Sequence, residues 1–182
     1  MRMKKGYFSL YEIALLSLLG ALIFVLKIVL KLPVHVPGHS GIFWMIPLIL
    51  GLAIVKKPGA ATYMGLISGI LTSFFGIGAL HVFDIFEYLS IGIATDICGY
   101  IFSYRFENPF VSVLTGVCAN LFRMVVNYSV QLLLGVQGFF IILGIGLSSV
   151  SNIIFGGLGG LIAALLIRKL MTAGVIGEDE TG

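Results

Sequence analysis

Long apolar stretches alternate with short polar, glycine-containing or proline-containing turns along the whole chain. A helix needs about 20 mainly apolar residues to cross the hydrocarbon core of a bilayer, and six stretches are apolar enough to be interpreted as such helices. The predicted spans are 10–30, 41–55, 59–75, 82–102, 110–134 and 139–167, of which the second is short. This pattern predicts an all-α fold, an integral membrane bundle of six transmembrane helices.

The composition supports a membrane protein and limits what else the chain can contain. Of its 182 residues, 59% are hydrophobic and 10% are charged, whereas about 25% of the residues of a soluble domain are charged. We expect a single transmembrane domain over 1–170 and a polar, disordered tail over 171–182. A nucleotide-binding domain is not expected, since no G-x-x-x-x-G-K-[ST] loop occurs. The net charge of +3 gives no reason to expect nucleic-acid binding.

Basic residues lie mainly on one side of the predicted membrane. Six spans place both termini on that side, and it holds Arg2, Lys4, Lys5, Lys56, Lys57, Arg105, Arg168 and Lys169. By the positive-inside rule this side is cytoplasmic, and we expect a multi-pass protein of a bacterial or archaeal plasma membrane. Near the outer side, Lys27 is expected to snorkel to the membrane surface. Trp44 is expected to lie in the outer interface, which favours amphipathic rings.

Polar side chains stand inside three of the spans, where lipid would not tolerate them. They are Asp84, Glu87, Tyr88 and Asp96 in the fourth span, Asn120, Arg123, Asn127 and Gln131 in the fifth, and Asn152 in the sixth. Ionisable groups inside a span usually face the interior of a helix bundle or a water-filled cavity. We therefore expect spans four to six to enclose a polar pocket that opens to the outside.

Asp96 and Arg123 are expected to form an ion pair. Counted at about 1.5 Å per residue from the outer ends of their spans, they lie roughly 20 Å and 17 Å deep. Pairing would greatly reduce the cost of burying either charge. The pair would either fix the packing of the two spans or contact a ligand directly.

Asp84, Glu87 and Tyr88 share one helical face near the outer surface. They are either the solvated start of a helix, where negative charge is favourable, or the rim of the pocket.

The loop 31–40, KLPVHVPGHS, contains the pair His35 and His39. On a helix this spacing would place both imidazoles on one face, but Pro37 and Gly38 interrupt a helix here. We expect no metal site, and interpret the loop as a cap that folds over the pocket.

The sequence G-H-S-G at 38–41 resembles the surroundings of the nucleophile in rhomboid intramembrane proteases. A serine nucleophile needs a base within reach, and His81 is the only histidine outside this loop. His81 lies in a turn, and not in the Ala-His-x-x-Gly setting on a later span that those proteases have. We therefore expect no catalytic residues and no enzyme, and keep the protease as a minor alternative.

Small residues predict close helix packing. In the sixth span, Gly144, Ser148, Asn152, Gly156, Gly160 and Ala164 recur every four residues and form one face for a neighbouring helix. Gly65 and Gly69 form a similar face in the third span. In the first span, Ala14, Ser17 and Ala21 are the small positions.

Taken together, six glycine-rich spans without an ATPase motif, a proline-bearing first outer loop and these polar positions resemble a known family. The chain is similar to the substrate-binding S components of energy-coupling factor (ECF) transporters, which take up vitamins. The resemblance implies partners: a transmembrane coupling subunit and two ATPase subunits that use ATP, while this chain itself carries no cofactor.

The resemblance also implies roles for residues. Small residues of the first span, often Ala-x-x-x-Ala, dock the coupling subunit in that family, so Ala14, Ser17 and Ala21 are the docking candidates here. The family's pocket is built from later spans and capped by the first loop. The substrate-binding candidates are therefore Asp84, Glu87, Tyr88, Arg123, Asn127 and Asn152, with His35 and His39 on the cap.

An organic vitamin or vitamin precursor is the expected substrate. The cobalt and nickel members of the family begin with Met-His, whereas this chain begins with Met1-Arg2-Met3. The alternative function is a self-sufficient secondary transporter of a small polar molecule. Many such carriers are built from internal repeats, and no repeat is visible between the two halves of this chain.

Overall fold

The computed structural model describes residues 7–29, 41–77, 81–136 and 138–176. Within these ranges the chain forms six α-helices and one short 3-10 helix, and no strand. They are α1 (Leu10–Val29), α2 (Gly41–Val55), α3 (Ala60–Phe74), η1 (His81–Phe83), α4 (Asp84–Ile101), α5 (Pro109–Leu133) and α6 (Gly138–Thr172). The all-α bundle is confirmed, and every helix lies close to its predicted span. α6 runs beyond the predicted limit at 167 into the expected tail, of which 177–182 lie outside the described residues.

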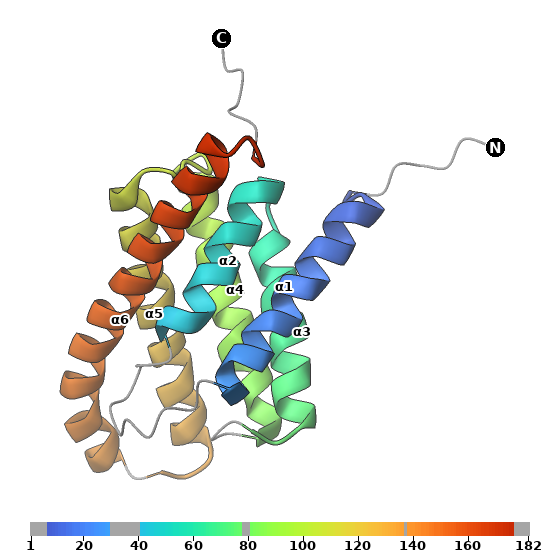
Figure 1. The fold of residues 1–182 in the computed structure, drawn as a ribbon. Coiled ribbons are helices and arrows are strands. Elements are labelled where there is room, and N and C mark those ends of the chain that lie inside the picture. The colour runs from blue at the N-terminus through green and yellow to red at the C-terminus, as the bar shows by residue number, and fades with distance from the viewer. Residues whose placement is uncertain (1–6, 30–40, 78–80, 137, 177–182) are drawn as a thin grey trace.

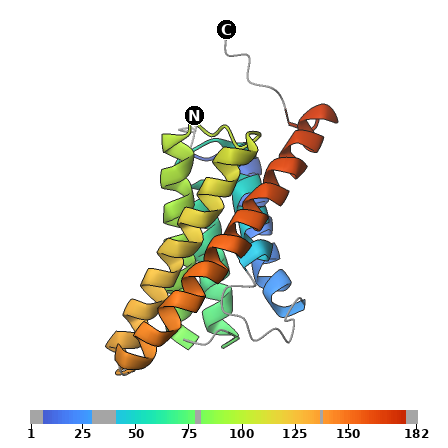
Figure 2. The same ribbon diagram turned by 90° about the vertical axis from the view of Figure 1, so that its left-hand side faces the viewer.

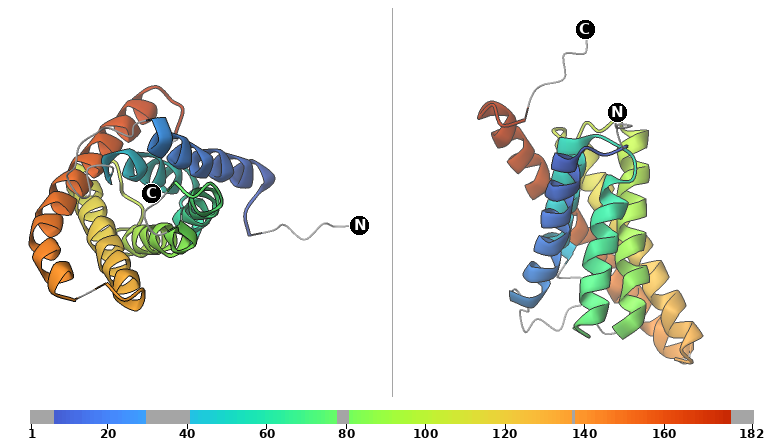
Figure 3. Two further views of the ribbon diagram at one scale, coloured as in Figure 1. Left: turned by 90° about the horizontal axis from the view of Figure 1, so that it is seen from below. Right: turned by 90° about the vertical axis from the view of Figure 1, so that its right-hand side faces the viewer.

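The helices alternate in direction, so that α1 begins and α6 ends at the same end of the bundle, the top of Figure 1. We call this the termini end, and the opposite one the far end. Neighbouring pairs are α1 with α3, α3 with α4, α4 with α5, and α5 with α6, while α2 contacts all five other helices. Seen along the bundle, α2 therefore lies on the inside of an arc formed by the others (Figure 3).

α2 forms the centre of the core. Its side chains are apolar on every face, which is typical of a helix that is buried all round. Met45, Leu48, Ile49 and Leu52 are all almost inaccessible to solvent. At 15 residues it is about 22 Å long, and it begins within the bundle and ends at the termini end (Figure 1).

The outer surface of the bundle is apolar enough for lipid. Within the described residues, three helices, at 10–29, 109–133 and 144–172, are long and apolar enough to cross a membrane, and α2 and α3 are shorter apolar helices. Large exposed side chains such as Leu18, Phe74, Ile97 and Leu133 cover the outside. Apolar side chains both inside and outside are expected for an integral membrane bundle.

Glycines allow α3 and α4 to approach closely. A Cβ atom added at Gly65 would lie 2.5 Å from the carbonyl oxygen of Tyr88, and one added at Gly69 would lie 3.0 Å from the Cα atom of Ile85. The predicted close-packing face of α3 is therefore confirmed, and its partner is α4.

Asp96 also joins these two helices, which contradicts the expected Asp96–Arg123 ion pair. Its carboxylate accepts hydrogen bonds from the backbone N–H groups of Ala61 and Thr62, at 3.1 and 2.7 Å, and from the Thr62 hydroxyl at 2.5 Å. The first N–H groups of a helix have no partner within it, and its N-terminus favours negative charge. Asp96 thus caps α3 from the neighbouring helix.

The prediction of this pair was wrong because the far ends of the helices are not level. α4 has 18 residues and α5 has 25, so α5 is longer by about 10 Å. Counted instead from the short loop that joins them at the termini end, Asp96 lies only about 8 Å along α4, and Arg123 about 21 Å along α5. The same count places Glu87 about 21 Å along α4, level with Arg123.

Candidate functional site

Arg123 of α5 forms its ion pair with Glu87 of α4. The Nη2 atom lies 3.1 Å from the Glu87 Oε1 atom, and the two side chains are 11% and 10% exposed. The guanidinium also lies over the ring of Trp44, with its Cζ atom 4.4 Å from the ring centroid. A buried charge is tolerated when it is paired and hydrogen-bonded, so this pairing explains how both groups can lie within the bundle.

Trp44 lies in the interior, and the prediction that it occupies the membrane interface was wrong. It is 4% exposed, and its indole N–H donates to the Asn120 Oδ1 atom at 3.4 Å. The ring of Tyr88 meets it edge-on, with centroids 5.7 Å apart at 80°. The reason is the short α2, which begins inside the bundle, so that its first turn lies at mid-depth.

Lys27 of α1 joins the group formed by Arg123, Glu87, Trp44 and Tyr88. Its ammonium lies 4.9 Å from the centroid of the Tyr88 ring, in a cation–π arrangement, and it does not snorkel as expected. Lys27 follows Ile23 by four residues and Gly20 by seven, and both are buried. Lys27 therefore lies on the buried face of α1, a position that the almost uniformly apolar sequence of this helix does not mark.

A small polar cavity lies between α5 and α6 beside this group. Its volume is about 150 Å³, and its lining residues are Arg123, Met124, Asn127, Tyr128, Gln131, Ser148 and Asn152. Gln131 donates to the Asn127 side chain at 2.6 Å, and the hydroxyl groups of Tyr128 and Ser148 are 2.6 Å apart. The structure thus brings together three of the predicted substrate-binding residues, Arg123, Asn127 and Asn152.

Some polar atoms of the residues that line this cavity are buried without a hydrogen-bond partner among the described residues. They are the Nε and Nη1 atoms of Arg123 and the Oδ1 atom of Asn152. The Asn152 amide nitrogen is used within its own helix, donating to the Ser148 carbonyl at 2.8 Å. Leaving such atoms unpaired costs free energy. A ligand that accepts from the two arginine nitrogen atoms and donates to the asparagine oxygen would satisfy them.

The other predicted residues lie nearby or outside the described ranges. Asp84 and Tyr88 are fully buried, so the start of α4 is not a solvated helix end, but neither residue lines the polar cavity. The cap residues His35 and His39, and the serine at position 40, lie outside the described residues.

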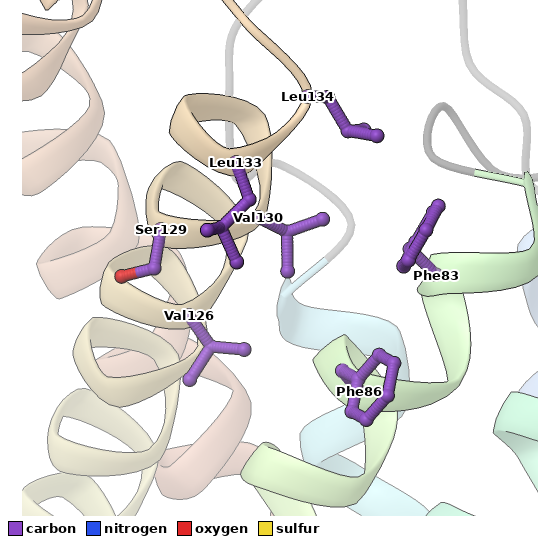
Figure 4. Close-up of a pocket in the computed structure, with 7 residues that line it drawn as sticks. All are labelled: Phe83, Phe86, Val126, Ser129, Val130, Leu133 and Leu134. Carbon is purple, nitrogen blue, oxygen red and sulfur yellow. The ribbon is translucent and has the colours of Figure 1, made fainter.

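A larger hollow exists, but its chemistry does not suit a polar ligand. It measures about 390 Å³ and is lined by Phe83, Phe86, Val126, Ser129, Val130, Leu133 and Leu134, at the far ends of α4 and α5 (Figure 4). Its one hydroxyl, on Ser129, donates back to the Val125 carbonyl at 2.8 Å. Specific binding of a polar molecule needs a few placed polar groups, so we take the smaller polar cavity as the candidate site.

Comparison with known proteins agrees with the membrane fold. The sequence model of one protein family, described as "ABC-type cobalt transport system, permease component", matches residues 10–122, more than half of the chain. The chain belongs to this family. Within the matched range lie Trp44 and Glu87, whereas Arg123 follows directly after it. The polar cavity is therefore built from the part of this permease component that the family model does not match.

One solved structure has a similar fold. It is described as "Crystal structure of an S-component of ECF transporter", and it matches with a TM-score of 0.67 and 16% sequence identity over 92% of this chain and 88% of that chain. At this identity the likeness concerns the fold, which the permease component shares almost from end to end. The search of curated proteins gives no match.

Proposed function

We propose that this protein is the substrate-binding S component of an ECF-type importer. It would capture its substrate in the polar cavity and release it inward when a transmembrane coupling subunit and two ATPase subunits use ATP. The observation that carries the proposal is the buried donor and acceptor atoms of Arg123 and Asn152, left unpaired inside a membrane bundle. The family of transport permease components and the S-component fold support it.

The distribution of basic residues supports a cytoplasmic termini end. Lys56 and Lys57 lie in the turn between α2 and α3, Arg105 lies between α4 and α5, and Arg168 and Lys169 lie near the end of α6. All of these segments lie at the termini end (Figures 1 and 2), and basic loops favour the cytoplasm. The far end, toward which the polar cavity lies, would then face outward from the plasma membrane.

The substrate we propose is a vitamin or vitamin precursor of about one ring. A cavity of about 150 Å³ holds a molecule as large as benzene, and the unpaired atoms call for acceptors toward the two arginine nitrogen atoms and a donor toward the asparagine oxygen. Cobalt fits this cavity poorly. Transition metals prefer imidazole, thiolate and carboxylate ligands, whereas the lining residues offer amides, hydroxyls, a thioether and the positive charge of Arg123.

In this proposal the predicted residues have different roles. Arg123, Asn127 and Asn152 contact the substrate directly, and Glu87 holds Arg123 through the ion pair. Asp84 and Tyr88 form the buried wall beside that pair. His35 and His39 remain our candidates for the cap.

Native mass spectrometry of gently purified protein tests the proposal. We expect a bound organic compound of defined mass, which disappears in Asn152→Leu because that variant loses the acceptor. Val150→Leu, on the exposed face of the same helix, is the matched control and should keep the compound. A wild-type protein that stays empty after exposure to a panel of vitamins would contradict a high-affinity binder. ATP-independent uptake by the pure protein in liposomes would favour the secondary transporter.

The outward face of α1 is our candidate docking surface for the coupling subunit. Ala14 is exposed and Ala21 is half-buried, beside the exposed Leu18 and Val25, on the side away from α2 and α3. Small residues on such a face let another helix approach closely. The Ser17 hydroxyl is instead 3.1 Å from the Tyr63 hydroxyl of α3, which assigns it to packing within the bundle.

Replacing Ala14 by tryptophan should uncouple binding from transport. The large ring would hold a partner helix away from α1, so ATP-dependent uptake by the reconstituted complex should fall at least about tenfold, by analogy with close-packed small-residue interfaces. Substrate occupancy in native mass spectra should not change. Ile97→Trp, an exposed position on α4, is the control and should transport normally. Equal uptake by both variants would remove α1 as the docking face.

A further inference from the structure

The Arg123 guanidinium contacts an aromatic residue that does not line the polar cavity. We propose that Trp44 of α2 is a positioning residue, which fixes the orientation of this guanidinium beside the polar cavity, where two of its nitrogen atoms have no hydrogen-bond partner among the described residues. The inference rests on the proposed function, because that function is what makes Arg123 a substrate contact.

Two different contacts restrain the guanidinium. The ion pair with Glu87 uses only the Nη2 atom, and a single contact of this kind leaves the group able to turn about it. The indole of Trp44 lies against the guanidinium, with 4.4 Å between the ring centroid and Cζ. A planar guanidinium packs favourably against an aromatic ring, so this second contact restrains how the group can turn about the ion pair. Neither contact provides a hydrogen-bond partner for Nε or Nη1, which are buried and unpaired among the described residues.

Trp44 is itself fixed by its surroundings. Its indole N–H is bound to Asn120, and the edge-on ring of Tyr88 lies against it. Asn120 is fully buried, and its side-chain amide nitrogen donates to the Gly116 carbonyl at 3.2 Å. Gly41 and Gly156 lie against its side chain, since a Cβ atom added at either would lie within 3 Å of its amide group. A binding group is most precise when the residues behind it are locked by packing and hydrogen bonds, and α2, α5 and α6 provide that support here.

This arrangement restricts how a substrate can meet Arg123. The indole lies against the guanidinium, with 4.4 Å between the ring centroid and Cζ, so a ligand can approach the nitrogen atoms only from the sides that the indole leaves open, through hydrogen-bond acceptors. Recognition would then depend on directed hydrogen bonds and not on charge alone, which a lysine at this position could not reproduce.

Arginine side-chain NMR tests the inference without any ligand. The chain has four arginines, so protein labelled with ¹³C and ¹⁵N in arginine gives few signals, and the loss of one signal in Arg123→Lys assigns Arg123. In the wild-type protein we expect the Arg123 side-chain protons to be shifted upfield by the indole ring, and the guanidinium to rotate slowly. Trp44→Leu should abolish both effects, and Trp44→Phe should retain a smaller upfield shift because an aromatic face remains.

Two further variants separate positioning from general packing. Leu48→Ala, one turn along α2 and equally buried, should lower the melting temperature but leave the Arg123 signals unchanged. Glu87→Gln should keep the upfield shift, because the stack persists. Unchanged Arg123 signals in Trp44→Leu would overturn the inference, as would an equal loss of the shift in Leu48→Ala or in Glu87→Gln. If Trp44→Leu does not fold, an unaltered shift in Trp44→Phe relative to wild type overturns it as well.

Failure of this inference and failure of the proposed function are distinguishable. The first would appear in the arginine spectrum of the protein without substrate. The second would appear as a wild-type protein that binds no compound in native mass spectra, whatever its arginine spectrum.

Discussion

Arg123→Leu should lose both substrate binding and much of the protein's stability. The substitution removes the unpaired donors at the cavity, and a hydrogen bond to a charged group contributes about 1.5–3 kcal/mol, or roughly 10-fold to 150-fold in affinity. It also leaves Glu87 buried without its ion-pair partner, a change that costs about 3–5 kcal/mol. Native mass spectrometry measures the occupancy, and thermal unfolding in detergent measures the stability.

Two comparisons separate these effects. Arg123→Lys keeps a positive charge for Glu87 but loses the planar donors, so it should recover stability while binding remains weak. Glu87→Gln combined with Arg123→Leu should be more stable than Arg123→Leu alone, because the unpaired carboxylate is gone. Normal occupancy in Arg123→Leu would rule out a role for this residue in binding.

Gly160→Val should prevent the protein from folding. A Cβ atom at Gly160 would lie 2.1 Å from the Ser112 carbonyl oxygen and 2.6 Å from its carbonyl carbon. These are backbone atoms, so α5 and α6 would have to separate along the surface that also forms the polar cavity. Overpacking typically costs about 1–3 kcal/mol, and we expect Gly160→Ala to reach the upper end of this range. The yield of monodisperse protein and the melting temperature are the measurements.

Gly157 provides the matched control on the same helix. A Cβ atom there would meet only the side chains of Val117 and Val113, at 3.5 and 3.6 Å, which is ordinary contact. Alanine favours a helix over glycine by about 1 kcal/mol, so Gly157→Ala should be neutral or slightly stabilising. Equal melting temperatures for Gly157→Ala and Gly160→Ala would contradict this account of the interface.

The helices could be predicted from the sequence because the bilayer sets their length and polarity. The stripe of small residues in the sixth span also predicted a packing face. Gly156 and Gly160 lie against Gly116 and Ser112 of α5, as that pattern requires. Both features are local, since they depend on residues a few positions apart on one helix.

The relative heights of the helices could not be predicted in the same way. Depths counted from the far ends paired Asp96 with Arg123, but α4 and α5 differ in length, and only the loop 102–108 between them fixes a common level. Depths along the two helices should therefore be counted from this short connection. That count places Glu87 level with Arg123. The inward position of Trp44 depends on where α2 begins relative to its neighbours, which no pattern within α2 specifies.

For the candidate site, the sequence identified most of the residues but not their arrangement. Arg123, Asn127 and Asn152 were predicted from polar residues in apolar spans, and the structure gathers them around one cavity. Lys27 and Trp44 were assigned to the membrane surface, because an amphipathic side chain near the end of a span commonly lies there. The roles of all these residues in binding remain predictions.

Trp44 is the only tryptophan in the chain, which gives the protein a built-in optical signal. Its indole is buried in direct contact with Arg123, so indole emission from this polypeptide originates beside the cavity and nowhere else. A change in the electric field or mobility of that guanidinium should alter the intensity or wavelength of the emitted light. Titrations could therefore be followed by intrinsic fluorescence, without a dye and without radioactive substrate.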